Sequence, residues 1–193
     1  MLRRLYDRTM ALAAHPRALG WLGLVAFVES SVFPVPPDVM LAPMVLAERR
    51  RAWLIAGVCT VASVLGGIAG YAIGYYLFEA IGQTVLDFYG YTDQFARFRD
   101  AYNENGVWIV AFFGLTPFPY KVITIASGVA GLDPLAFMIA SLASRGLRFY
   151  LVAGLLWLFG PPIRDFIERR LGLVVTVFFV ALVGGFAVLR YLP

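Results

Sequence analysis

The chain is poor in two residue types on which many enzyme sites and disulfide frameworks depend. Among its 193 residues there is one cysteine, Cys59, and one histidine, His15. A single cysteine cannot form an intramolecular disulfide and gives little basis for a thiolate metal site. The histidine lies in the basic N-terminal stretch, so Ser-His and Cys-His catalysis and HExxH zinc sites are excluded from the apolar part of the chain. We therefore expect no catalytic residues, no metal and no cofactor.

Charged residues are also scarce. They make up 15% of the chain, whereas 61% of the residues are hydrophobic, well above the apolar content of about half that is typical of soluble domains. This composition predicts an integral membrane protein, and we expect no nucleic-acid partner.

The apolar residues fall into five stretches of two kinds. Residues 52–80, 134–160 and 171–190 are each long enough to cross a bilayer, which takes about 20 apolar residues. Residues 19–48 and 106–132 are too short for two spans each and are interrupted in the middle by proline, which breaks a helix. We predict three transmembrane helices and two re-entrant helical hairpins.

Charge placement orients these segments. Residues 1–18 alternate apolar and basic side chains, which predicts an amphipathic helix on the membrane surface or, as the alternative, a disordered basic tail. If residues 19–48 dip into the membrane and return, the arginines before them and those at 49–51 lie on one side, as the positive-inside rule requires. The acid-rich segment 81–105 then lies outside, and the N-terminus lies in the cytoplasm.

The two proline breaks have the same pattern. Pro34-Val-Pro36-Pro37-Asp38 and Pro117-Phe-Pro119-Tyr-Lys121 both read P-x-P-x-charge, and each lies in a hairpin that is followed by a long span. One hairpin enters from the cytoplasm and the other from outside, so the halves form an inverted repeat of the kind found in secondary transporters. We predict one all-α membrane domain, 1–193: two re-entrant hairpins each followed by a transmembrane helix, plus the C-terminal transmembrane helix and the N-terminal amphipathic helix.

Proline inside a membrane leaves backbone carbonyls that lipid cannot satisfy. Such backbone persists only where it is buried in protein or lines a wet cavity. We therefore expect the hairpin tips to meet. The residues expected to line the cavity there are Pro34, Pro36, Pro37, Pro117 and Pro119.

Apart from Glu48 at the end of the first hairpin, five charged residues lie in the hairpins and the second span. Glu29 and Asp38 belong to the first hairpin, Lys121 is the only lysine of the chain, and Arg145 and Arg148 share a helix face. An arginine at the centre of a membrane helix costs about 2.5–3.5 kcal/mol. One interpretation is that an acid pairs with an arginine and locks a hairpin to the span. The other is that the three cations bind a phosphate, while Glu29 or Asp38 carries a proton.

Small residues mark one face of the first span. Gly66, Gly70 and Gly74 recur every four residues, a spacing that lets another helix approach closely. The same face permits a homodimer without requiring one.

These motifs resemble the DedA family, also called the VTT or SNARE-associated Golgi domain family, and in particular its compact YqaA-like branch. The resemblance rests on the two hairpins, "ESSVFPVPPD" and "FFGLTPFPYKVITIASGVAGL", and on "SRGLRF" in the next span. It implies inverted re-entrant hairpins and movement of lipids between leaflets, with Glu29 and Asp38 as the functional acids. Larger members carry R-F-x-P-x-x-R in the second hairpin. Here Gly114 stands at the first arginine position and Tyr120 or Lys121 near the second.

The resulting hypothesis is a flippase-like transporter of the bacterial inner membrane. It would move a polyprenyl phosphate such as undecaprenyl phosphate, or a phospholipid, and would be coupled to the proton motive force. Lys121, Arg145 and Arg148 would bind the phosphate, and Glu29 and Asp38 would carry the proton. The alternatives are a transporter of a small solute or ion, and a membrane scaffold that does not transport and whose buried ion pairs are structural.

Overall fold

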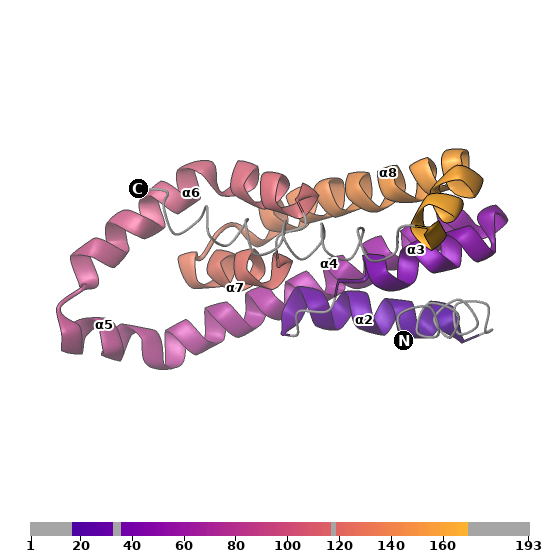
Figure 1. Cartoon of the computed structure of the whole chain (residues 1–193). Coiled ribbons are helices and arrows are strands. Elements are labelled where there is room, and N and C mark those ends of the chain that lie inside the picture. Colours follow the sequence, from indigo (N-terminus) through magenta and orange to yellow (C-terminus); the bar gives the residue numbers. More distant parts are fainter. Residues whose placement is uncertain (1–16, 33–35, 117–118, 170–193) are drawn as a thin grey trace.

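The computed structural model describes residues 17–32, 36–116 and 119–169, and in this part of the chain every regular element is helical. The predicted all-α class is confirmed for these residues. The predicted span 171–190 and nearly all of the predicted amphipathic helix 1–18 lie outside the described residues, as do Pro34 and Pro117. The elements (Figure 1) are α2 (Ala18–Ser31), α3 (Asp38–Ala47), a 3₁₀ turn (Arg49–Arg51), α4 (Ala52–Leu77), a π-helical turn (Phe78–Gly82), α5 (Gln83–Tyr89), α6 (Thr92–Leu115), α7 (Tyr120–Ala130) and α8 (Pro134–Arg169).

Two of these helical stretches are long and apolar enough to cross a membrane. They are Arg49–Gly82, with 34 residues, and Pro134–Gly160, with 27 residues. They coincide with the spans expected at 52–80 and 134–160. In α8 the backbone leaves helical geometry at Phe159, with φ −108° and ψ 16°, immediately before Gly160-Pro161-Pro162. Proline lacks the N–H of the helical ladder, which accounts for the bend.

The proline breaks separate pairs of helices. α2 ends at Ser31, and α3 begins at Asp38 with Pro37 as its N-cap residue. In the second half, α6 ends at Leu115, and α7 begins at Tyr120 after Pro119. Proline suits these starts because its fixed φ is close to that of a helix and the first N–H groups have no helical acceptor. The helix α6 runs without interruption across residue 105, where the sequence analysis placed the end of an external segment.

The helices pack in the same pattern in both halves. In the first half α2 packs on α4, and in the second α6 packs on α8. The helix after each proline break packs on the long helix of the other half: α3 packs on α8, and α7 packs on α4. The two long helices, α4 and α8, also contact each other. In Figure 1, α2 and α7 follow different parts of α4 and their ends meet near the middle of the molecule.

Glycines allow this close approach along α4. A Cβ added to Gly66 would overlap the backbone of Phe27 in α2, and one added to Gly74 would overlap the backbone of Ile125 in α7. At Gly70 the added atom would overlap the hydroxyl of Thr124. The small-residue face was predicted to admit a neighbouring helix, and it admits two.

The interior is divided into two apolar clusters. The first gathers residues of α2, α3, α4 and α8, among them Leu41 and Phe149. The second gathers residues of α6, α7 and α8, among them Val110 and Phe137. Along α8, the buried residues between the two clusters are Ser141, Ser144 and Arg145. The central part of the molecule is therefore polar inside.

Candidate functional site

The centre of the molecule holds a buried ion pair between the first hairpin and α8. Arg145 Nη2 lies 2.9 Å from Glu29 Oε2, with 1% and 8% of the two side chains exposed. Arg145 Nε donates to Ser63 Oγ at 2.7 Å. The guanidinium carbon also lies 4.9 Å from the ring centre of Tyr120 and 4.7 Å from that of Phe149, a geometry of favourable cation–π contacts. Arg145 is thus enclosed by protein on all these sides.

Glu29 also joins α2 to α7. Its Oε1 accepts the backbone N–H of Tyr120 at 3.2 Å. Tyr120 is the first residue of α7, so Glu29, which lies in α2, caps a helix of the other half, where a negative charge is favoured. Ser30 Oγ donates to Oε2 at 3.1 Å and lies 2.7 Å from Ser63 Oγ. The carboxylate therefore has three donors, Arg145, Ser30 and the backbone N–H at the start of α7.

A second ion pair lies nearer the surface. Arg148 Nη2 is 2.6 Å from Asp38 Oδ2, with 14% and 26% of the side chains exposed. Asp38 is the first residue of α3, directly after the first proline break. Arg148 Nη1 also donates to the carbonyl of Thr116, which follows the last residue of α6. Arg148 therefore connects the edges of both breaks to α8.

Lys121 completes the contact between the hairpins. Its Nζ donates to the carbonyl of Val32 at 3.0 Å, and Thr124 Oγ1 donates to the carbonyl of Ser30, also at 3.0 Å. Among the described residues, no carboxylate lies within ion-pair distance of Lys121. The cation is partly exposed and has a carbonyl as its partner.

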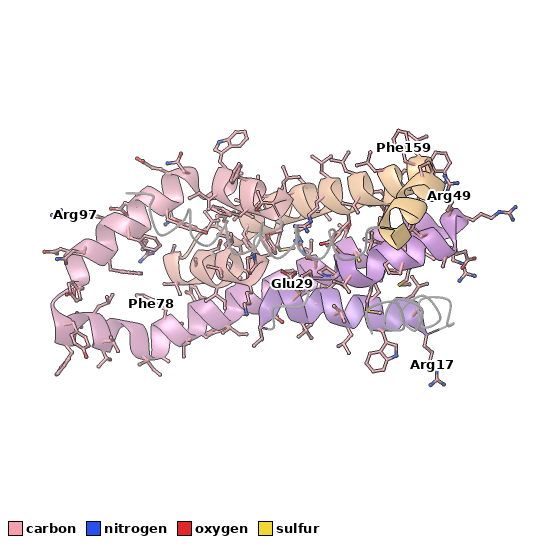
Figure 2. All side chains as sticks on the ribbon, in the orientation of Figure 1. Arg17, Glu29, Arg49, Phe78, Arg97 and Phe159 are labelled. Carbon is pink, nitrogen blue, oxygen red and sulfur yellow. The ribbon has the colours of Figure 1, made fainter. Side chains whose placement is uncertain are left out.

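All five charged residues selected from the sequence thus meet at the hairpin junction, and Figure 2 shows Glu29 near the middle of the molecule, far from Arg97 and Arg17. The roles of these residues in binding phosphate and carrying protons remain predictions. Of the prolines expected to line a cavity, Pro37 is buried, and Pro36 and Pro119 are half-buried.

The residue pattern did not predict the side-chain contacts of Ser30 and Tyr120 at the junction. Ser30 and Ser63 bind the Glu29–Arg145 pair, and the Tyr120 hydroxyl lies 2.6 Å from Ser141 Oγ. The signal for Ser30 was its place beside Glu29 in "ESS". For Tyr120 the signal was its position directly after the second proline break. That position predicts a backbone N–H without a helical acceptor, but it does not predict a contact of the side-chain hydroxyl.

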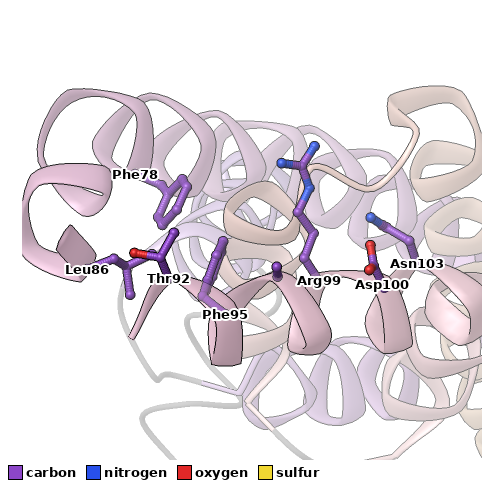
Figure 3. A pocket seen from close by; sticks show the side chains of 8 residues that line it. Phe78, Leu86, Thr92, Phe95, Arg99, Asp100 and Asn103 are labelled. Atoms are coloured by element: carbon purple, nitrogen blue, oxygen red, sulfur yellow. The ribbon is translucent and has the colours of Figure 1, made fainter. Parts of the chain in front are cut away.

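A separate groove lies away from the junction. It has a volume of about 370 Å³ and lies where the π-helical turn, α5 and α6 meet (Figure 3). The residues that line it include the stacked rings of Phe78 and Phe95 together with Arg99, Asp100 and Asn103. Within residues 17–32, 36–116 and 119–169, no group of three or more His, Cys, Asp or Glu residues could hold a metal ion.

Comparison with known proteins gives a family match. The family model of the VTT domain matches residues 33–158 of the chain. An uncharacterized protein of Haemophilus influenzae is 40% identical over 151 residues, which cover 78% of each chain. An uncharacterized protein of Histophilus somni shows the same identity and coverage. No solved structure matches.

Proposed function

Because this chain belongs to the VTT domain family, the DedA family, whose domain is membrane-associated, we propose that it transports a lipid phosphate across the bacterial inner membrane. The lipid is a polyprenyl phosphate such as undecaprenyl phosphate, or a phospholipid. Transport is coupled to the proton motive force. Two hairpins that enter the membrane from opposite sides form the path.

The distribution of polarity supports a position within the membrane. Large apolar side chains such as Leu65 in α4 and Leu151 in α8 are more than half exposed, whereas Glu29 and Arg145 are buried. Ser63, which binds Arg145, follows Arg51 by 12 residues, or about 18 Å of helix. A hydrocarbon core is about 30 Å thick, so the ionic junction lies near its middle. Ionisable groups at that depth are costly and are typical of substrate paths.

The imbalance of charge at the junction carries the proposal. Lys121, Arg145 and Arg148 supply three positive charges, and Glu29 and Asp38 supply two negative ones. The unmatched cation is Lys121, which is partly exposed. A phosphate group would restore neutrality, because charge-assisted hydrogen bonds to its oxygens are strong and arginine can bind it in a bidentate way.

The surroundings of Gly114 and Tyr120 support a basic site built from α8. A Cβ at Gly114 would overlap Ser144 of α8, and the ring of Tyr120 lies against Arg145 of α8. In this chain, therefore, side chains of α8 fill the space beside the two positions where larger relatives carry arginine. We propose that Arg145 and Arg148 supply the positive charge that the second hairpin lacks.

One observation favours the scaffold as the second candidate. Arg145 and Arg148 are each already paired with one acid, Glu29 and Asp38 respectively. A protein that uses these pairs only to hold its hairpins together would show the same contacts. A transporter of small solutes or ions is the third candidate, and the experiment below separates all three.

The test is leaflet exchange in proteoliposomes. Fluorescent phospholipid and a C55 polyprenyl phosphate are followed with and without an imposed pH gradient, for the wild type, Arg148→Gln and the matched control Arg97→Gln. Arg97 is exposed on α6, away from the junction. We expect Arg148→Gln to slow exchange about tenfold or more, since a hydrogen bond to a charged group contributes about 1.5–3 kcal/mol, and Arg97→Gln to leave the rate unchanged.

The other outcomes identify the alternatives. A folded wild-type protein that moves neither lipid would refute lipid transport. If such a protein moved inorganic phosphate or another small ion instead, the solute transporter would stand. If it moved nothing and Arg148→Gln only lowered its stability, the scaffold would stand.

A further inference from the structure

We infer that the two ion pairs have different roles: Glu29–Arg145 is a permanent structural bond, whereas Asp38 occupies on Arg148 the place that a phosphate takes when the ligand binds. Asp38 takes up one proton as the phosphate displaces it. This inference rests on the proposed function, and it makes the binding of phosphate and the binding of a proton one linked event.

The number of partners separates the two pairs. Glu29 has three donors, from Arg145, Ser30 and the backbone of Tyr120. Among the described residues, the one side chain that donates to Asp38 is Arg148. Releasing Glu29 would also uncap α7 and leave Arg145 buried, whereas releasing Asp38 breaks one contact.

The exposure of the side chains also distinguishes the two ion pairs, and it again indicates that Asp38 is the more easily released acid. The side chains of the first pair are at most 8% exposed, and the Asp38 side chain is 26% exposed. An incoming phosphate and a proton can therefore reach Asp38 and Arg148 from outside the protein without opening its core. Arg145 has its guanidinium between the rings of Tyr120 and Phe149 and offers no free side to a ligand.

Replacing Asp38 by phosphate on Arg148 would change how the helices beside the two proline breaks are held together. Its guanidinium binds Asp38 at the start of α3 and the carbonyl of Thr116 at the end of α6. Both contacts lie beside a proline break. Replacing Asp38 by a mobile phosphate releases the first hairpin from this bridge, while Glu29 keeps the two hairpin ends attached to each other.

The balance of charge around Arg148 explains why Asp38 takes up a proton when phosphate binds. Two groups that interact electrostatically with Asp38, besides its partner Arg148, are Arg145 on α8 and Cys59 on α4. Arg145 is neutralised by Glu29, and Cys59 is a buried free thiol, so neither offers Asp38 a second free cation. With a phosphate on Arg148, the Asp38 carboxylate would face another anion. Protonation removes this repulsion.

The experiment is calorimetric titration of the full chain in detergent with farnesyl monophosphate, using buffers of different ionisation enthalpy. These buffers give the number of protons taken up per bound ligand. The headgroup has its own ionisation near pH 6, so the informative quantity is the difference between the wild type and Asp38→Asn. We expect the wild type to take up about one proton more than Asp38→Asn, because one carboxylate has been removed. Asp38→Asn should bind about tenfold more tightly or better, because the competing charge is gone.

One further variant and two further ligands locate the effect. Glu29→Gln should lower the unfolding temperature and retain the extra proton. Farnesol, which lacks the phosphate, should cause no proton uptake. Inorganic phosphate that matches farnesyl monophosphate in affinity and proton uptake would support the exchange at Arg148 and identify free phosphate as the ligand.

Failure of the inference differs from failure of the proposed function. Equal proton uptake by the wild type and Asp38→Asn, or weaker binding by Asp38→Asn, would overturn the exchange while phosphate binding stood. Loss of the extra proton in Glu29→Gln but not in Asp38→Asn would reverse the roles and also overturn it. A wild-type protein that binds neither farnesyl monophosphate nor inorganic phosphate would overturn both proposals.

Discussion

Replacing Arg145 by methionine tests how firmly the centre of the protein depends on its buried ion pair. Methionine retains a long apolar side chain but removes the charge 2.9 Å from Glu29 and the donor to Ser63. Removing one member of a buried pair typically costs about 3–5 kcal/mol, because the other charge is left buried. We expect Arg145→Met to lower the free energy of unfolding by that amount, and Glu29→Gln by a similar amount.

The double variant Glu29→Gln/Arg145→Met sharpens this prediction. Among the described residues it has no buried charge, and the glutamine amide oxygen can still accept the Tyr120 N–H that Glu29 accepts now. We expect the double variant to lose only about 1–2 kcal/mol, the contribution of the remaining hydrogen bonds. The measurement is reversible unfolding in mixed micelles of increasing SDS content, monitored by tryptophan fluorescence and circular dichroism.

The Asp38–Arg148 pair provides the control cycle. Its side chains are less buried than those of Glu29 and Arg145, and Asp38 has fewer donors than Glu29, so its coupling energy should be the smaller of the two. If the Glu29–Arg145 cycle is additive within about 0.5 kcal/mol, or gives no larger coupling than the control, our account of the buried pair is wrong.

Three other substitutions, the first with a matched control, give simpler tests. Gly74→Ala should destabilise the protein by about 1–3 kcal/mol because the new Cβ overlaps the backbone of α7. Gly20→Ala is the control: nothing lies within 4 Å of the added atom, so this variant should be neutral or slightly stabilising. Both are measured in the same unfolding assay, and equal losses of stability would contradict the packing argument. Lys121→Gln should slow lipid exchange in proteoliposomes about tenfold or more with little change in stability, and unchanged exchange would remove Lys121 from the site. Tyr120→Phe deletes the hydroxyl that lies 2.6 Å from Ser141 Oγ and should cost about 1 kcal/mol without changing exchange; a large loss of exchange would place that hydroxyl in the transport path.

The elements that the sequence predicted well are those fixed by strong local chemistry. Proline cannot donate a backbone hydrogen bond, so the helix ends near Pro37 and Pro119 could be located from the sequence. The apolar runs that form α4 and the first part of α8 exceed the length needed to cross a bilayer. Charge, in contrast, indicates the side of a membrane rather than the secondary structure. The acid-rich segment therefore gave no sign that α6 would continue through residue 105.

The pairing of the charges could not be predicted. Arg145 and Arg148 share one face of α8, and both acids lie in one hairpin, so either arginine could have paired with either acid. The choice depends on how α2 and α3 separate around the two long helices, because α2 packs on α4 and α3 on α8. That arrangement follows from contacts between distant segments, which residue spacing does not reveal.

The cap that Glu29 places on α7 also has a consequence for biosynthesis. Glu29 is 91 residues from the backbone donor of Tyr120 and 116 residues from Arg145. At about 5–20 residues per second, a ribosome needs roughly 6 to 23 seconds after adding Glu29 before it adds Arg145. For most of that interval Glu29 has neither the cation nor the helix end that stabilise its carboxylate, and it lacks the cation until the interval ends. The N-terminal half therefore cannot adopt its final buried position as it emerges, and the centre of the protein closes only after most of the chain has been made.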